Sequence, residues 1–258
     1  MIGIIGGSGL YDGGLFHLSE RRKVHTPYGS PSDGVALGEF SGVPVAFLSR
    51  HGPGHVVNPT NVNYRANIFA LKEVGVTRIL GVSAVGSLQE NIRPGELVVP
   101  DQFIDFTKGR KSSFFEGAQV AHVSMGEPFC PHVRKNMVDS LARQGIPHHS
   151  AGTYVCIEGP RFSTRAESRL FRSWNGHVIG MTLCPEAVLA REAELCYANL
   201  SLVTDYDSFA DHPVTAEEVV RVMRSNVEKA KKVLVDVIPG LGNDRSCLCG
   251  SALKSALM

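Results

Sequence analysis

Apolar and polar positions alternate along the chain with the spacings of strands and helices. Apolar runs bounded by glycine or polar residues predict buried strands at Met1–Ile5, Arg78–Val82, Leu97–Pro100, Gly152–Glu158 and Tyr197–Val203. Apolar residues three and four positions apart predict helices at Asn61–Val74, Pro131–Gln144, Thr164–Trp174 and Pro185–Leu195. Two further signals predict a hairpin over Val35–Ser49, turning at Ser41-Gly42, and a last helix that a capping box opens at Thr215 and that reaches Ile238.

This order of elements predicts one α/β domain with three layers. No linker or repeat interrupts the alternation, so we expect a mostly parallel or mixed central sheet covered by helices on both faces. Residues 1–240 form the main body of the domain, and the tail 241–258 belongs to it. Residues 107–127 lack a clear period and predict a long functional loop or subunit contact. Ligands of such folds bind beyond the carboxyl ends of strands, which directs attention to Gly6–Gly9, Ser83–Gly86, Glu158–Ser163 and Thr204–Asp207.

Composition narrows the class of partner. The chain has 258 residues, of which 43% are hydrophobic, and its 26 basic and 25 acidic side chains give a net charge of +1. That apolar fraction is typical of a folded globular protein, and the balanced charge provides no basic surface for nucleic acid or anionic lipid. No signal peptide or membrane span is recognisable. We expect a cytoplasmic protein whose partners are small molecules or copies of itself.

Three groups of anion-binding donors follow separate predicted strands. Gly6–Gly9 supplies backbone N–H groups and the Ser8 hydroxyl. Arg50 and His51 supply charge-assisted donors, and Ser83-Ala84 follows a third strand. Each group has a plainer interpretation, such as a tight turn or a structural ion pair, and a metal held by His51 and His55 is disfavoured because Gly52-Pro53-Gly54 prevents a helix. Together the three groups predict one phosphate site.

The segment Asp205-Tyr206-Asp207 predicts a purine site. In an extended chain residues i and i+2 point the same way, so both carboxyl groups would face one ligand edge. Such a pair tends to share a proton, and a donor beside an acceptor suits N7 and the N6 amino group of a 6-aminopurine. A surface turn and a divalent-metal site are the alternatives. Phe162 is a candidate for stacking on a base, and Met181-Thr182 for lining a sugar and reaching a phosphate.

Eight motifs in the same order resemble one known family. They are GGSGL, TPYGSPSD, RHGPGHVVNPTNVNYRANIFAL, SAVGSL, GELVVPDQFID, IEGPRFSTRAES, GMTLCPEAVLARE and LCYANLSLVTDYD. These motifs resemble the trimeric purine nucleoside phosphorylases, and within them the branch that acts on 5′-methylthioadenosine, over residues 1 to about 238. The resemblance implies a single α/β fold with a distorted mixed sheet and sites at subunit interfaces. It also implies phosphorolysis of methylthioadenosine with inorganic phosphate as co-substrate, and no metal or organic cofactor.

The resemblance also assigns roles to individual residues. The implied phosphate-binding residues are Ser8, Arg50, His51, Ser83, Ala84 and Thr182. Met181 would pack under the ribose, Phe162 and Ser163 would line the purine, and Asp205 and Asp207 would act on N7 and N6. His122 would serve the methylthio pocket of a neighbouring subunit, and Ala216 would lie near the 5′ group. Ser8 and Ser83 stand where many relatives have Thr, which retains the hydroxyl.

The cysteines and the tail carry a second set of expectations. Six cysteines are present without a CxxC motif, which disfavours a zinc ribbon or a thioredoxin-type site. The tail RSCLCGSALKSALM resembles archaeal, heat-stable relatives. That likeness implies disulfides Cys130–Cys196 and Cys247–Cys249, stability to heat, and a trimer or a hexamer made of two trimers.

Three other functions stay open from the sequence. A purine nucleoside phosphorylase of broad specificity would also accept adenosine, inosine and guanosine. A nucleosidase would use water in place of phosphate, although Arg50 and His51 argue against it. A nucleotide-binding or redox module based on GGSG and CLC is disfavoured, because the third glycine of a dinucleotide fingerprint is missing.

Overall fold

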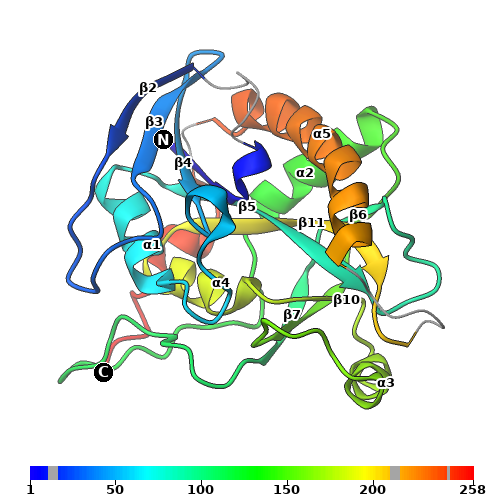
Figure 1. The fold of residues 1–258 in the computed structure, drawn as a ribbon. Helices are drawn as coiled ribbons and strands as arrows, with labels where there is room; N and C mark the ends of the chain where they lie inside the picture. Colours follow the sequence, from blue (N-terminus) through cyan, green and yellow to red (C-terminus); the bar gives the residue numbers. More distant parts are fainter. Residues whose placement is uncertain (11–16, 210–215, 243–244) are drawn as a thin grey trace.

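A mixed sheet runs through the centre of the molecule (Figure 1). The computed structural model describes residues 1–10, 17–209, 216–242 and 245–258. Within these ranges eleven strands join one sheet. They are β1 (Ile2–Gly6), β2 (His17–Arg22), β3 (Val35–Phe40), β4 (Val43–Ser49), β5 (Arg78–Ser87), β6 (Leu97–Val98), β7 (Gln102–Phe106), β8 (His148–His149), β9 (Thr153–Ile157), β10 (Val178–Gly180) and β11 (Cys196–Tyr206).

Strand β5 is the axis of the sheet because it pairs with three neighbours. Along one edge, β11 runs parallel to it from Arg78 to Ser87. Along the other edge, β1 runs parallel to the first half of β5, and β10 runs antiparallel to its end at Gly86 and Ser87. The path β2-β3-β4-β1 extends the sheet on one side of this change of direction, and β10-β9-β7 extends it on the other. The predicted α/β class with a mixed sheet is confirmed.

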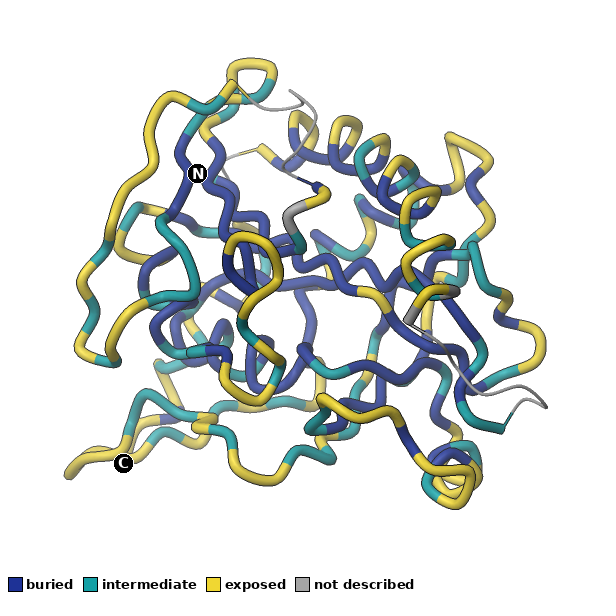
Figure 2. The backbone as a smooth tube through the Cα atoms, viewed as in Figure 1, coloured by how far each residue is buried: buried dark blue, intermediate teal, exposed yellow. Residues whose placement is uncertain are grey.

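Helices cover both faces of the sheet (Figure 1). One apolar core joins β1, β5 and β11 to helices α2 (Pro131–Arg143) and α5 (Ala216–Gly240). The opposite core holds α1 (Tyr64–Glu73) and α4 (Leu183–Glu192). Helix α3 (Arg165–Ser173) packs Phe171 against Val155 and Ile179 at the end of the sheet. The central strands are the most buried part of the backbone (Figure 2), as expected for a sheet with both faces covered.

Most predicted elements are confirmed, and one local prediction is wrong. The hairpin forms as β3 and β4, with Ser41 and Gly42 at positive φ in its turn. The strand predicted to end at Val82 instead continues through residues 83–87 as β5, because β11 provides a parallel partner as far as Ser87. The strand β2 was not predicted from the sequence, because its residues HLSERR are mostly exposed and do not alternate between apolar and polar. Thr215, the predicted start of the last helix, lies outside the described residues.

The loop 107–127 and the chain end lie against each other. Ala121 forms an isolated bridge with Leu257, and the His122 N–H donates to the Ala256 carbonyl at 2.8 Å. The tail also reaches the body, because the Leu253 N–H donates to Glu194 Oε1 at 3.0 Å. In Figure 1 this loop and the tail run together below α4.

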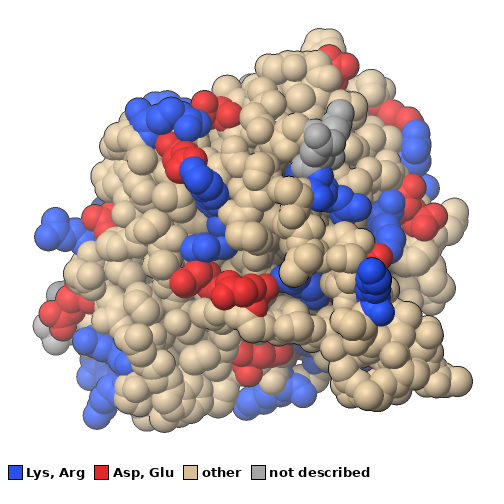
Figure 3. All heavy atoms as spheres, turned by 180° about the vertical axis from the view of Figure 1, so that it is seen from behind, with Lys and Arg blue, Asp and Glu red and all other residues tan. Residues whose placement is uncertain are grey.

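The surface carries both signs of charge side by side. Figure 3 shows lysine and arginine next to aspartate and glutamate across the face seen from behind. Several of these groups form exposed pairs, such as Lys135–Asp139 and Arg143–Asp236. Among the helices described here, none combines the length and apolar character that a bilayer crossing requires.

Gly180 provides a test of the packing beside the change of strand direction. A methyl group added there would lie 1.9 Å from Tyr154 Oη and 3.2 Å from Val85 Cγ1, and both residues are buried. We expect Gly180→Ala to lower the free energy of unfolding by about 1–3 kcal/mol, since overpacking forces neighbours to move. Denaturant unfolding measures this. The control Gly117→Ala, whose added methyl meets open space, is expected to unfold like the unaltered chain; equal midpoints for all three proteins would contradict the prediction.

Candidate active site

Two strands, β1 and β10, pair with the same edge of β5 and run toward each other without meeting. We call the unpaired stretch between them the gap. The strand β1 ends at Gly6 and β10 ends at Gly180, and between their pairings Val82–Val85 have no partner strand on this edge. Ala84 is exposed here, although the residues on either side of it in β5 are buried. Solvent therefore reaches the middle of the sheet at Ala84, and the loops that follow β1, β4 and β10 begin beside it.

The residues expected to bind phosphate come from strands that lie next to this gap. The strands β4, β1 and β5 are adjacent and parallel, so their carboxyl ends lie along one side. The Arg50 N–H donates to the Gly6 carbonyl at 3.0 Å, which joins the loop after β4 to the glycine loop after β1. Ser83 Oγ lies in the gap itself and hydrogen-bonds Asn199 Oδ1 at 3.2 Å. The side chain of Ser8 lies outside the described residues.

Arg50 is buried beneath the gap and held in one orientation. Its Nε and Nη2 donate to the two oxygens of Glu186 at 2.7 and 2.8 Å, and its other bonds go to the carbonyls of Val82 and Ile5. Burial alone would lower the pKa of Arg50, but the Glu186 carboxylate outweighs it and raises that pKa above its usual range. Four of the five guanidinium N–H groups are thus engaged, which leaves one on Nη1 for a ligand.

Glu186 and Tyr197 are site residues that the sequence analysis missed. The Glu186 carboxylate accepts from Arg50 and from the Tyr197 hydroxyl, the latter at 2.7 Å, and is 1% exposed. A buried carboxylate requires such compensation, because an unpaired charge in the interior is strongly unfavourable. The available signal was an acidic residue within the otherwise apolar run LCPEAVLA.

His51 is a neutral side chain that can both donate and accept a hydrogen bond. Its Nδ1 lies 2.8 Å from the Val57 carbonyl, which assigns the ring proton to Nδ1 and leaves Nε2 as an acceptor. Burial, followed by the charge of Arg50, lowers the pKa of His51 to about 4. The His51 and His55 rings stack with centroids 4.2 Å apart.

Met181 and Thr182 reach the gap from the opposite side. Thr182 is the N-cap residue of α4, yet its side chain makes no capping hydrogen bond and is 7% exposed. Its hydroxyl is therefore available to a ligand, and the backbone leaves the helical conformation at Cys184 before the regular part of α4 begins. Met181 is half-buried and packs over Gly159, where an added Cβ would lie 2.5 Å from Met181 Sδ.

Asp205 and Asp207 lie where β11 passes Gly86 and Ser87. A register shift between Val203 and Asp205 sets Asp205 opposite Gly86, and Thr204 Oγ1 donates to Asp205 Oδ1 at 2.6 Å. The Asp207 N–H donates to the Ser87 carbonyl at 2.8 Å. Ser163 Oγ donates to Asp207 Oδ1, whereas Asp207 Oδ2 is buried with no hydrogen-bond partner among the described residues. A buried carboxylate oxygen without a donor is suited to accept from a ligand.

The loop after β9 completes this side of the gap. Phe162 is 43% exposed and Ser163 is buried. The loop is anchored by Arg110, a further residue that the sequence analysis did not single out. Arg110 donates to Glu158 Oε1 at 3.2 Å and to the carbonyls of Glu158, Met181 and Cys184. Because Arg110 lies in the loop 107–127, that loop is fastened directly to the site.

Two expected residues are not brought to the gap by this single chain. His122 is exposed on the loop that pairs with the tail. Ala216 begins α5, but its side chain lies outside the described residues. The resemblance had implied that His122 serves a neighbouring subunit, and its exposed position is compatible with that role.

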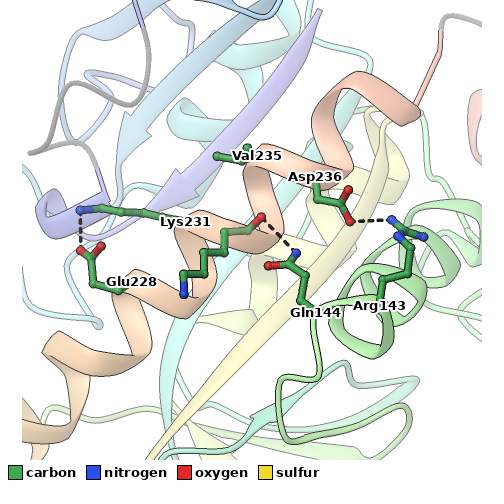
Figure 4. Close-up of a pocket in the computed structure, with 7 residues that line it drawn as sticks. Arg143, Gln144, Glu228, Lys231, Val235 and Asp236 are labelled. Atoms are coloured by element: carbon green, nitrogen blue, oxygen red, sulfur yellow. Dashed lines mark hydrogen bonds and ion pairs between the residues drawn. The ribbon is translucent and has the colours of Figure 1, made fainter.

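A hollow between α2 and α5 lies apart from these residues (Figure 4). Four of its five charged groups form two ion pairs, since Lys231 pairs with Glu228 at 2.8 Å and Arg143 pairs with Asp236. Gln144 Nε2 donates to the Lys232 carbonyl at 3.2 Å. None of the residues that line it follows the end of a strand, so we do not assign it to the candidate site.

The cysteines differ from the pattern that the resemblance implied. All six are free thiols, so neither Cys130–Cys196 nor Cys247–Cys249 is bridged in this structure. The physical reason is that four of the sulfurs share one site instead of forming two separate pairs. The closest approach described between them, 3.3 Å, joins Cys196 to Cys247.

The gap therefore combines two chemistries. One side offers a buried cation, a neutral imidazole and hydroxyls, which suit an anion with several oxygens. The other side offers two carboxyl groups and a half-exposed aromatic ring, which suit a flat heterocycle with ring nitrogens and an amino group.

Comparisons with known proteins agree with this geometry. The model of the phosphorylase superfamily matches residues 1–239. The S-methyl-5′-thioadenosine phosphorylases of Thermofilum pendens and Saccharolobus solfataricus are each 56% identical to the chain. They align with 100% of the chain and with 98% and 97% of their own lengths.

Solved structures give the same result. A methylthioadenosine phosphorylase from an antarctic soil metagenomic library superposes with a TM-score of 0.95 at 47% identity, covering 100% of this chain and 92% of that one. The Schistosoma mansoni methylthioadenosine phosphorylase in complex with adenine superposes with a TM-score of 0.93 at 37% identity, covering 98% and 96%. On the match of nearly the whole chain in sequence and in fold, this protein belongs to the phosphorylase superfamily.

Proposed function

We propose that the protein cleaves 5′-methylthioadenosine with inorganic phosphate to give adenine and 5-methylthioribose 1-phosphate. The observation that carries the proposal is the opening over Val82–Val85, with the buried cation Arg50 on one side and the Asp205–Asp207 pair on the other. The names of the relatives support the substrate. None of those quoted above is named as a purine nucleoside phosphorylase of broad specificity.

Phosphate would bind on the side of Arg50. The free N–H on Nη1 and the Thr182 hydroxyl donate to its oxygens, as would Ser8 and the backbone at Ala84. Ser83 would join them by turning its hydroxyl away from Asn199 Oδ1. Because His51 Nε2 carries no proton, it accepts a hydrogen bond from a protonated phosphate oxygen or takes up a proton when the dianion binds. Glu186 makes no direct contact with phosphate in this arrangement; it fixes the plane of the guanidinium.

The purine would bind on the side of the carboxyl pair. Asp207 Oδ2 accepts from the N6 amino group, while Ser163 donates to its other oxygen. Asp205 carries a proton and donates it to N7. Phe162 covers the base. Met181 packs under the ribose, and Arg110 fixes its backbone by donating to the Met181 carbonyl.

The reaction follows from this arrangement. The bond between C1′ and N9 breaks as a phosphate oxygen attacks C1′ from the Arg50 side, and the anion stabilises the positive charge that develops on the sugar. Asp205 transfers its proton to N7, so adenine leaves neutral, and the carboxylate regains a proton when the product is released. General acid catalysis of this kind contributes about 10²–10⁴-fold, and the fixed position of phosphate supplies a further effective concentration. Neither step calls for a metal or an organic cofactor.

We further propose that the working unit is a trimer or a hexamer of two trimers and that it is stable to heat. The position of His122 supports association. It is exposed on the loop 107–127, where it could contact the 5′ group bound by a neighbouring subunit. The likeness of the tail RSCLCGSALKSALM to heat-stable relatives supports stability to heat.

Phosphate dependence tests the proposed function directly. We expect adenine release from methylthioadenosine to require phosphate and to exceed turnover of adenosine, inosine and methylthioinosine. Absorbance or chromatographic detection of the free base measures it. Comparable turnover of inosine would instead make the protein a purine nucleoside phosphorylase of broad specificity, and cleavage without phosphate would make it a nucleosidase.

Asp207→Asn tests the recognition of the amino group. An amide no longer presents an anionic acceptor, so kcat/KM for methylthioadenosine is expected to fall about 10–100-fold, the value of a hydrogen bond to a charged group. The fall for methylthioinosine, which has no N6 amino group, is expected to be much smaller. The control Ser163→Ala removes only the donor to Asp207 and should lower both activities less; an equal loss on both substrates in Asp207→Asn would contradict the assigned role.

The neutral state of His51 predicts a dependence of stability on pH. Its pKa is about 4 in the folded chain and about 6.5 when unfolded. Between these values the unfolded state binds more protons, so stability is full above pH 6.5 and is lost as the pH falls. From pH 8 to pH 5 this residue should remove about 2 kcal/mol from the free energy of unfolding.

Denaturant unfolding at both pH values measures this effect. His51→Gln is expected to show the smaller loss, and the control His25→Gln, at an exposed position, should behave like the unaltered chain. Saturating phosphate should also reduce the loss, because an anion favours the imidazolium. Identical pH dependence in all three proteins would show that His51 is not held neutral.

A further inference from the structure

Four cysteines from distant parts of the chain meet at one place. Cys130 is the N-cap residue of α2, Cys196 begins β11, and Cys247 and Cys249 lie in the tail at the short helix Leu248–Ser251. Their four sulfur atoms all lie within 4.8 Å of one another. Within the described ranges this is the one group of three or more potential metal ligands this close together.

The spacing fits four ligands around one ion. A zinc ion bound by four thiolates has Zn–S bonds of about 2.3 Å in a tetrahedron, which places the sulfurs roughly 3.8 Å apart. The closest described pair, Cys196 and Cys247, is 3.3 Å apart, and the outer limit is 4.8 Å. Sulfurs joined in a disulfide are about 2.05 Å apart, so the observed distances are nearer to those of a shared ion.

The surroundings favour thiolates at this place. The backbone N–H of Val133, in the first turn of α2, hydrogen-bonds the Cys130 sulfur, and the thiols of Cys196 and Cys249 also interact with it. A helix N-terminus stabilises negative charge, so a metal-bound sulfur at Cys130 is in a favourable position. Cys130, Cys196 and Cys249 are buried in the core shared by α2, α5 and β11, whereas Cys247 is half-buried and gives access from solvent.

The remaining cysteines provide an internal comparison. Cys156 and Cys184 are also buried and near each other, because the Cys184 N–H donates to Cys156 Sγ at 3.3 Å. These two sulfurs have no third or fourth potential ligand grouped with them among the described residues. Burial of thiols alone therefore does not create such a group in this fold.

We propose that Cys130, Cys196, Cys247 and Cys249 bind one Zn²⁺ ion that fastens the tail to the start of β11 and to the N-terminus of α2. Binding converts four thiols into four metal-bound thiolates and releases four protons to solvent, which balances the charge. The ion would serve a structural purpose, because the four ligands close the coordination sphere. It would stabilise the folded chain through its preference for the folded state.

The test begins with the complete protein, reduced, freed of metal and given one equivalent of Zn²⁺. We expect elemental analysis after gel filtration to find one zinc per chain, and the four thiols to resist a thiol reagent until a strong chelator is added. The zinc form should also have a higher Tm than the metal-free form by several degrees. Replacement of Zn²⁺ with Co²⁺ should give the strong visible absorption of a tetrahedral thiolate complex.

Variants distinguish zinc bound by these four cysteines from zinc bound by other thiols of the chain. Cys247→Ser/Cys249→Ser should lose zinc and the cobalt absorption, and Cys156→Ala should keep both. If the double variant fails to fold, Cys247→Ser alone changes only the half-buried ligand and should weaken zinc retention by at least tenfold. Retention of zinc by either tail variant at the level of the unaltered chain would overturn the proposal.

The oxidised alternative gives a different result. Purified protein that lacks zinc and has an intact mass lower than the reduced chain by about 2 Da for each of two bridges contains disulfides. Two such bridges that also re-form in the presence of zinc would overturn the proposal. Reduced protein that passes gel filtration without zinc would overturn it as well. None of these measurements depends on enzymatic activity, so they stand apart from the proposed phosphorolysis.

Discussion

The geometry of the candidate site depends on β5 having two partners of opposite direction on one edge. The strand β1 runs parallel to it and β10 antiparallel, so the two neighbours end facing each other. In a parallel sheet the loops that bind the ligand normally lie beyond the carboxyl ends of the strands, on one side of the sheet only. Here the ends of β4, β1, β10 and β9 converge over Val82–Val85, while β11 carries Asp205 past the same point on the other edge. The anion and the base can therefore be bound within one opening, which the phosphorolysis proposed here requires.

The buried Arg50–Glu186 pair is the electrostatic counterpart of that geometry. Arg50 follows β4, Glu186 lies on α4, and Tyr197 on β11 donates to the same carboxylate. Removal of one partner from a buried pair typically costs about 3–5 kcal/mol, so this network both stabilises the fold and fixes one cation at the gap. The pair lies in the interior of the molecule, and one N–H of Arg50 remains for the phosphate proposed above.

The peripheral segments are tied to the centre by a few polar and sulfur contacts. Arg110 fastens the loop 107–127 to the carbonyls of Glu158 and Met181, and the tail pairs with the same loop at Ala121 and Leu257. The four cysteines, with or without an ion, join the tail to the opposite side of the sheet. The long loop, the chain end and the site are consequently parts of one packing arrangement.

The sequence by itself determined the α/β class, the helices and most of β1, β5, β9 and β11, because the spacing of apolar residues and the positions of glycines are local properties. It did not predict β10, which has only three residues. It also identified the donor groups at Gly6, Arg50 and Ser83 and the pair Asp205–Asp207, since their chemistry follows from residue type. Only the tertiary structure decided that residues 83–87 continue a strand, because their partner in β11 lies more than a hundred positions away in the sequence. The same holds for Glu186, Arg110 and the four cysteines. Their roles are set by neighbours brought together in three dimensions, and no pattern along the chain records such distances.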